Sequence, residues 1–403
     1  MTKFYLGNRL ADIPPEISRG DCVASNRDLN KAGKAKKDEF YTMLADIEVE
    51  LKHYRKHFKG KTVLCNCDDP FESNFFKYFV LNFNRLGLKK LIATCYATSP
   101  IMGSRFQYRV NDSGQMSFFF DEGIPVDNEG KRPYKAVVTQ VYDKTGDGGV
   151  SMLAVAKLFM DGDNELSELS GDGDFRSPEC IDLLAEADIV VTNPPFSLFR
   201  EYLGTLVEHN KHFIIIGNVN AVKYQEVFPL FMTNKLWLGA SIHSGDRAFF
   251  VPDDYPLDAA GCGIDEETGR KYIRVKGVRW FTNLDIKQRH EEMILVRRYT
   301  PDEYPKYVNY DAIEVAKTSD IPCDYAGEMG VPITFMDKYN PDQFEIVGAS
   351  QHLIREISDD IRAKARYSQI GCFYLDNCDG TYRKMYDRIV IRNKNPEAPR
   401  EAQ

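Results

Sequence analysis

The sequence predicts an α/β domain built on a mostly parallel, doubly wound sheet with helices on both faces. Short apolar runs rich in β-branched residues recur along the chain and alternate with helical patterns. Near-continuous apolar strands separated by helices are typical of parallel sheets that are covered on both sides. We expect strands in seven segments: residues 61–66, 89–96, 187–193, 212–220, 235–240, 247–252 and 278–284.

The chain before the first strand is basic. Residues 1–37 carry few apolar anchors after the first ten, and the sequence NKAGKAKKD is typical of a mobile arm. Residues 52–61 add further lysine, arginine and histidine side chains. A solvated helix face and a nucleic-acid contact explain the basic stretch from Lys31 to Lys61 about equally well.

The clearest helix follows the first strand. The sequence SNFFKYFVLNFNRLG (73–87) begins with the capping residues Ser73 and Asn74 and stops at Gly87. Its apolar side chains fall on one side, which predicts a stripe that faces the core: Phe75, Phe76, Phe79, Val80, Phe83 and Leu86.

The strand and helix alternation is interrupted between residues 97 and 168. The sequence RFQYRVNDSGQMSFFF (105–120) predicts a hairpin that turns at residues 112–114, and later turn signals make the segment a β-rich insertion. After about residue 300 the chain is rich in proline and tyrosine. It then shows a helical pattern near 352–366 and a strand pattern in DRIVIRN (387–393).

Composition indicates a soluble cytoplasmic protein. The 403 residues are 43% hydrophobic and 28% charged, with a net charge of −8, and they suffice for one large domain or two ordinary ones. No apolar run approaches the roughly 20 residues of a membrane span, and the start has no signal-peptide core. The nine cysteines form no Cys-x-x-Cys pair, so we expect reduced cysteines and no metal site.

Polar residues follow three of the predicted strands. Because ligands of open parallel sheets bind beyond the carboxyl ends of the strands, these positions are the first candidates for a site. Capping residues follow two of them, with Ser177 and Pro178 expected to start one helix and Ser197 the next. The three motifs are VLCNCDDPFES (63–73), GDGDFRS (171–177) and VVTNPPFS (190–197).

The tetrapeptide Asn193, Pro194, Pro195 and Phe196 has a specific chemical use. A planar exocyclic amine is a poor nucleophile because its lone pair is delocalised into the ring. Two acceptors, the Asn193 side-chain carbonyl and the Pro194 backbone carbonyl, would favour a lone pair directed out of the ring plane. Phe196 offers a ring for stacking. Asn-Pro-Pro can also simply end a strand, because proline cannot continue a ladder.

Several segments together carry a family resemblance. The chain resembles the EcoRI-type DNA adenine-N6 methyltransferases from about Asn30 onward. The matching segments are KKDEFYT (36–42), CNCDDP (65–70), SNFFKYF (73–79), LGLKKLIA (86–93), GDGDFRS (171–177), ADIVVTNPPFSLFREYL (187–203), WFTNLD (280–285) and MGVPITF (329–335).

The resemblance implies a Rossmann-like class I methyltransferase fold in the γ order of motifs. It implies a mobile arm at 1–37, a catalytic domain at 38–300 and a target-recognition region at 301–403. The first-strand loop lacks the glycines usual in methyltransferases, and the second strand ends without an acid for the cofactor ribose. The resemblance implies S-adenosylmethionine as cofactor, bound by Asp38, Phe40, Tyr41, Thr42, Asn66, Asp68, Asp69, Pro70, Asp174 and Phe175.

The resemblance also implies double-stranded DNA as the partner, with the target adenine flipped out of the duplex. Backbone contacts would come from the basic arm and the 52–61 segment. Specificity would come from the insertion and the region after 300. We expect a monomer of bacterial or phage origin; a cognate restriction endonuclease would be a further partner that the sequence does not reveal. The residues proposed for DNA are Lys34, Lys36 and Lys37 in the arm, with Arg366, Arg383 and Lys384 as candidates for specificity.

Two other interpretations stay open from the residues. Asn-Pro-Pro-Phe suits any planar nitrogen, so RNA or a protein glutamine amide could be the methyl acceptor. The second interpretation is a DNA-binding module without catalysis, which the intact Asn-Pro-Pro-Phe tetrapeptide disfavours.

Overall fold

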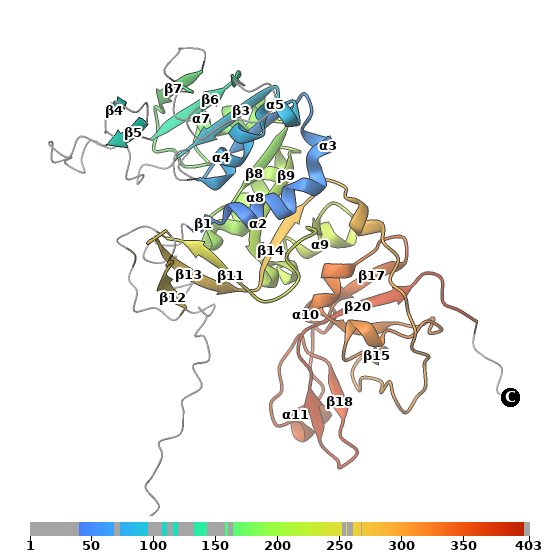
Figure 1. Ribbon diagram of the computed structural model, residues 1–403. Helices are drawn as coiled ribbons and strands as arrows, with labels where there is room; N and C mark the ends of the chain where they lie inside the picture. Colours follow the sequence, from blue (N-terminus) through green and yellow to red (C-terminus); the bar gives the residue numbers. More distant parts are fainter. Residues whose placement is uncertain are drawn as a thin grey trace, which may run out of the picture.

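The structure is a computed structural model (Figure 1). It describes residues 40–67, 73–95, 133–142, 158–159, 164–251, 255, 261–266 and 268–398, and the backbone alone of 107–110 and 116–119. Some residues predicted for the site lie outside these ranges: Lys34, Lys36, Lys37, Asp38, Asp68, Asp69 and Pro70.

An eight-stranded mixed sheet forms the centre of the fold, in the order β10-β14-β9-β8-β2-β3-β6-β7. The four strands from β9 to β3 are parallel, as predicted. Both flanks are antiparallel instead, and β6 and β7 of the predicted insertion extend one edge. The bounds are Trp237–Leu238, Val278–Thr282, His212–Asn218, Ile189–Thr192, Thr62–Cys65, Lys90–Thr94, Tyr134–Val138 and Glu165–Glu168.

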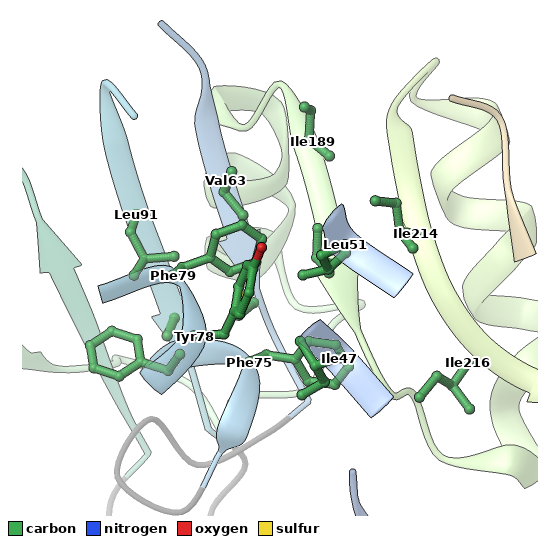
Figure 2. Packing of buried hydrophobic residues seen from close by; sticks show 14 of the residues in the cluster. Ile47, Leu51, Val63, Phe75, Tyr78, Phe79, Leu91, Ile189, Ile214 and Ile216 are labelled. Atoms are coloured by element: carbon green, nitrogen blue, oxygen red, sulfur yellow. The ribbon is translucent and has the colours of Figure 1, made fainter. Parts of the chain in front are cut away.

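Side chains of the central strands alternate between two hydrophobic clusters, one on each face. In β2, Val63 and Cys65 belong to the first cluster and Leu64 to the second. Helices α2 (Leu44–Leu51) and α4 (Asn74–Leu81) cover the first face, as Figure 2 shows. The second face is covered by α7 (Pro178–Glu186), α8 (Phe199–Glu208) and α9 (Phe228–Met232).

The predicted phenylalanine-rich helix is confirmed with one break. The Ser73 hydroxyl accepts hydrogen bonds from the backbone N–H groups of the second and third residues beyond it, at 3.2 and 3.4 Å. After α4 the chain turns at Asn82 and continues as α5 (Phe83–Leu86). It ends at Gly87, whose φ of 63° is a left-handed conformation that glycine adopts without steric cost.

Of the two other predicted helix starts, one is confirmed and one is wrong. The Ser177 hydroxyl caps α7 and Pro178 is its first residue. Ser197 does not cap a helix. It lies inside a 3-10 turn, Phe196–Leu198, and α8 begins only at Phe199 because the chain first tightens through this turn.

A second, four-stranded antiparallel sheet lies against the first cluster, in the order β1-β11-β13-β12. The bounds are Tyr41–Thr42, Asp246–Phe250, Lys271–Lys276 and Cys262–Ile264. The expectation that residues 247–252 join the main sheet is therefore wrong. In β13, buried Ile273 and Val275 alternate with partly exposed residues, the pattern of a sheet covered on one face only.

A third sheet of four strands, β15-β16-β20-β17, forms the centre of the C-terminal part. Strand β20 confirms the predicted DRIVIRN strand, whereas the predicted helix near 352–366 is replaced by two short helices, α10 and α11. The strands span Ile313–Glu314, Met329–Pro332, Arg388–Asn393 and Phe344–Ala349; the helices span Ser350–Leu353 and Asp359–Lys364.

Smaller elements complete the fold. Strands β4 (Gln107–Val110) and β5 (Met116–Phe119) pair as the predicted hairpin. Strands β18 (Tyr374–Asp376) and β19 (Tyr382–Lys384) form another hairpin. A 3-10 turn and α3 (Arg55–Phe58) lead into β2. Among the described residues, no helix has the length and apolar character that crossing a membrane requires.

The main and C-terminal sheets are joined by apolar and ionic contacts. Phe228 of α9 and Ile346 of β17 belong to the same hydrophobic cluster. Arg279 of β14 donates from Nε to a carboxylate oxygen of Asp337 at 2.6 Å, and both side chains are almost fully buried. Breaking such a buried pair by removing one partner costs about 3–5 kcal/mol.

Candidate active site

Two buried asparagines end neighbouring strands of the main sheet. Asn66 follows β2 and Asn193 follows β8, and each residue is 5% exposed. Because β2 and β8 are parallel neighbours, both asparagines lie at the same edge of the sheet. This is the edge at which open α/β sheets bind their ligands.

The side-chain amide of Asn193 is held at one end only. Its Nδ2 donates to the Phe40 carbonyl at 2.6 Å. Since a carbonyl oxygen only accepts, this bond fixes which end of the amide carries the oxygen. That oxygen, Oδ1, is buried and has no hydrogen-bond partner in the described part of the chain. An unsatisfied buried acceptor costs about 1–3 kcal/mol, so the site is prepared to receive a donor from a ligand.

The residues after Asn193 form a rigid turn with an aromatic ring at its end. Pro194 is buried, and Pro195, with φ −52° and ψ 127°, leads into the 3-10 turn. The half-buried Phe196 ring packs nearly perpendicular to Phe40 and Phe249, with centroids 5.7 and 6.2 Å apart. These contacts hold the ring beside Asn193.

Strand β1 brings part of the predicted N-terminal motif to this edge. Phe40, Tyr41 and Thr42 are all buried, and β1 pairs with β11. The Thr42 carbonyl accepts from Asn74 Nδ2 at 2.7 Å, which ties β1 to the first residue of α4. Thr42 Oγ1 is a second buried polar atom without a hydrogen-bond partner among the described residues.

Asn66 is held by partners within the chain. Its side-chain oxygen accepts from the Tyr202 hydroxyl, and its backbone carbonyl accepts from Thr192 Oγ1. Cys67 follows with a φ of 72°. The chain therefore makes a left-handed turn directly after β2 without a glycine, at the position where the sequence lacks the usual glycine-rich loop.

The predicted pair Asp174 and Phe175 is connected to Asn66 through Tyr202. The Phe175 ring packs edge-on against Tyr202 with centroids 5.0 Å apart. The Asp174 carboxylate accepts two hydrogen bonds from the Arg176 side chain, from Nη2 at 2.5 Å and from Nε at 2.8 Å, and a third from the Arg176 backbone N–H at 2.9 Å. These hydrogen bonds hold the pKa of Asp174 below its usual value, so the carboxylate stays charged at neutral pH.

The structure thus brings Phe40 into contact with both Asn193 and Phe196, and it links Asn66 to Phe175 through Tyr202. Sequence reasoning missed several members of the site. Tyr202 could have been found from helix spacing, since it lies on the buried face of α8. Phe249 shows no local signal, because only the tertiary fold brings it there, and the contact of the predicted capping residue Asn74 with Thr42 shows none either. The members missed are Tyr202, Phe249 and Tyr255.

The basic stretch at 52–61 lies elsewhere. Its last residue, Lys61, precedes the first residue of β2 and pairs with Asp188 at 3.2 Å, just before β8 begins. These residues lie at the amino-terminal edge of the sheet, opposite Asn193. Tyr54 and Phe58 of the same stretch are buried. This placement does not favour the expected DNA contact.

Comparison with known proteins identifies the family. The family model described as adenine-specific methyltransferase EcoRI matches residues 28–394. The chain belongs to this family of adenine-specific methyltransferases. It is 47% identical to the type II methyltransferase M.EcoRI of Escherichia coli over 326 residues, which cover 80% of this chain and 89% of that protein.

A second relative of this methyltransferase is the type II methyltransferase M.MpnI of Mycoplasma pneumoniae. The two are 37% identical over 370 residues, which cover 91% of this chain and 98% of the relative. No solved structure matches the chain. In a methyltransferase, the unsatisfied Asn193 oxygen and the adjacent ring of Phe196 form a site suited to a planar amine.

Proposed function

We propose that this methyltransferase transfers the methyl group of S-adenosylmethionine to N6 of adenine in duplex DNA. The observation that carries the proposal is the Asn193 amide, whose nitrogen is anchored on Phe40 while its buried oxygen has no partner in the described chain. The membership of the adenine-specific family and the names of the relatives, which are type II methyltransferases, support the same conclusion.

The chain acts by orienting the amine. Asn193 Oδ1 accepts one N–H of the adenine N6 group, and the Pro194 carbonyl accepts the other. These bonds draw the lone pair out of the ring plane, so that N6 attacks the methyl carbon in line. When bound, S-adenosylmethionine would supply a methyl carbon activated by a positively charged sulfur, which would leave with the electrons of the C–S bond as N6 takes the methyl group and releases a proton to solvent.

The residues present fit the proposed cofactor. Thr42 Oγ1 is a buried polar atom that lacks a partner among the described residues, and the carbonyl of the same residue accepts a hydrogen bond from Asn74 at the start of α4. The buried Phe175 packs against Tyr202, and the partly exposed Asp174 directly precedes it in the chain. The parallel strands β9, β8, β2 and β3, with antiparallel β14 beside β9, agree with a Rossmann-like class I arrangement. Asp38, Asp68, Asp69 and Pro70 stay proposed contacts.

The burial of Asn193 requires the adenine to leave the duplex. An acceptor on a residue that is only 5% exposed is out of reach of a base stacked within DNA. We expect the flipped base to stack on Phe196. The division of labour proposed is a mobile DNA-binding arm at 1–37 with Lys34, Lys36 and Lys37, a catalytic domain at 38–300 and target recognition at 301–403.

A methyl-transfer assay with three acceptors tests the proposal. The protein is incubated with tritiated S-adenosylmethionine and with plasmid DNA, total RNA or denatured protein. We expect label in DNA only, and mass spectrometry of the digested DNA should find N6-methyladenine. Label in RNA or in protein glutamine, with none in DNA, would replace the proposal with the alternative acceptor. Failure to bind S-adenosylmethionine in calorimetry would leave only a binding module.

A further inference from the structure

A groove with a cavity volume of about 690 Å³ separates the main sheet from the C-terminal sheet. One wall comes from α8, α9 and the 3-10 turn Val219–Lys223, and the other from β17, α10 and the residues after it. Figure 1 shows α9 beside β17 and α10. The charged residues in its lining are Arg200, Lys223, Glu226 and Arg355, beside the polar residues Tyr224, Gln225, Gln351 and His352.

The groove lies at the same edge of the sheet as Asn193. The turn that ends at Lys223 directly follows β9, and β9 is the parallel neighbour of β8, which Asn193 ends. Arg200 follows Phe196 by four residues. Four residues of extended chain span at most about 14 Å, so the Cα atom of Arg200 lies within that distance of Phe196. At about 3.4 Å per nucleotide along a strand, this is roughly four nucleotides.

The charge of the groove is positive on both walls. Arg200 and Arg355 are exposed, and neither has an ion-pair partner in the described part of the chain. The Arg200 guanidinium instead lies over the Tyr224 ring, 5.1 Å from its centroid. Lys223 is paired with Asp387, and Glu226 is the acidic residue among those that line the groove. Two arginines that share one groove without carboxylate partners are suited to an anionic ligand.

We propose that this groove binds the sugar-phosphate backbone of the DNA strand that carries the target adenine, within a few nucleotides of the flipped base. Arg200 from the catalytic part and Arg355 from the C-terminal part each contact a phosphate. The inference rests on the proposed function, because it takes DNA as the substrate. Beyond that function, the inference states where the DNA strand lies on the protein and which side chain binds it on each wall of the groove.

Salt-dependent binding tests the proposal. Fluorescence anisotropy with a labelled DNA duplex of mixed sequence compares wild type with Arg200→Ala, Arg355→Ala and the double variant. Each lost phosphate contact should reduce the slope of log K against log salt by about 0.9, which is about 8-fold weaker binding at 0.1 M salt. The double variant should bind roughly 60-fold more weakly. Glu226→Gln should tighten binding, because it removes the acid from the lining.

A matched control is Arg85→Ala. Arg85 is also exposed but lies on α5, which leads to the amino-terminal end of β3 and the opposite edge of the sheet. Its variant should keep the wild-type slope. Steady-state methylation should show KM for DNA raised in Arg200→Ala and Arg355→Ala with kcat retained, which a folding defect would not produce.

The outcomes separate this inference from the proposed function. If wild type methylates plasmid DNA but the double variant keeps the wild-type affinity and salt slope, the groove does not bind DNA and the inference is wrong. If wild type binds DNA and the double variant loses the two contacts, but no methyl transfer occurs, the groove stands and the proposed reaction fails.

Discussion

Replacing Asn193 with alanine is the sharpest test of the catalytic site. The substitution removes the Nδ2 donor that reaches the Phe40 carbonyl at 2.6 Å, together with the unpartnered acceptor Oδ1. The two losses affect different properties. The donor stabilises the fold by holding β1 against the end of β8, whereas the acceptor contributes only when an amine is bound.

The expected magnitudes follow from these contacts. Losing the hydrogen bond and leaving the Phe40 carbonyl unpaired costs about 1–3 kcal/mol, but removing an acceptor that is already unsatisfied recovers a similar amount. We therefore expect the free energy of unfolding to change by less than about 2 kcal/mol. Removing one of two groups that stabilise the transition state should lower the rate about 10²- to 10³-fold, or about 2.7–4 kcal/mol.

The assay is single-turnover methylation with the enzyme and cofactor mixed before DNA is added. Calorimetry measures the Kd for S-adenosylmethionine, which should stay within a few-fold of wild type. Asn283→Ala is the matched control. Asn283 uses both ends of its amide, with Oδ1 accepting from Phe213 N–H and Nδ2 donating to the Lys211 carbonyl, at the opposite edge of the sheet. The Asn283→Ala variant should have a lower free energy of unfolding but the same methylation rate as wild type. A turnover of Asn193→Ala within tenfold of wild type would refute the mechanism.

Three further predictions concern the ring, the junction and pH. Phe196→Ala should weaken productive DNA binding, measured as KM, by about 1–3 kcal/mol because the flipped base loses its stacking partner. Phe196→Trp keeps an aromatic ring and should keep the wild-type KM. A KM for Phe196→Ala equal to that of wild type would contradict stacking. Asp337→Ala should lower the free energy of unfolding by about 3–5 kcal/mol in urea titrations, because it leaves the Arg279 guanidinium buried and unpaired. The control Asp311→Ala breaks the exposed pair with Lys306 and should lower it by at most about 1 kcal/mol. Equal losses of stability in the two variants would show that burial of the Arg279–Asp337 pair does not matter. The Asp337 carboxylate, 3.9 Å from His243 Nδ1, raises the pKa of His243. Protonated His243 therefore stabilises the fold below its unfolded pKa of about 6.5, and this contribution is lost as pH rises through the raised value. The free energy of unfolding measured across that range should fall less in His243→Gln than in wild type, and identical pH curves would exclude the linkage.

The parts of the fold that depend on local patterns could be predicted from the sequence. Strands β2, β3, β8 and β9 are continuous apolar runs because both of their faces are buried. The caps Ser73 and Ser177 bond to N–H groups two or three residues away, so they are visible in the sequence. Asn193 and the turn after it were predicted for the same reason, since four consecutive residues supply the chemistry.

The parts that depend on distant contacts could not be predicted. Strand β11 reads as one more apolar run, and only its pairing with β13 and β1 places it in a separate sheet. The donor bond from Asn193 to Phe40 spans 153 residues, so nothing local indicates which end of the amide is free. Strands β6 and β7 lie in the segment that was predicted to be a β-rich insertion, and its irregular turns gave no sign that these two strands join the edge of the main sheet.

The hydrophobic core shared by α9 and β17 limits which segments of this enzyme can be exchanged with those of a relative. Phe228 and Ile346 pack in one cluster, and the Arg279–Asp337 pair joins the same two parts. A C-terminal region excised for grafting would expose that apolar surface and leave a buried charge without its partner. A chimera that takes its C-terminal region from a relative is therefore expected to fold only when it also takes the matching face of α9, whereas substitutions on the exposed surface of that region should leave the fold intact.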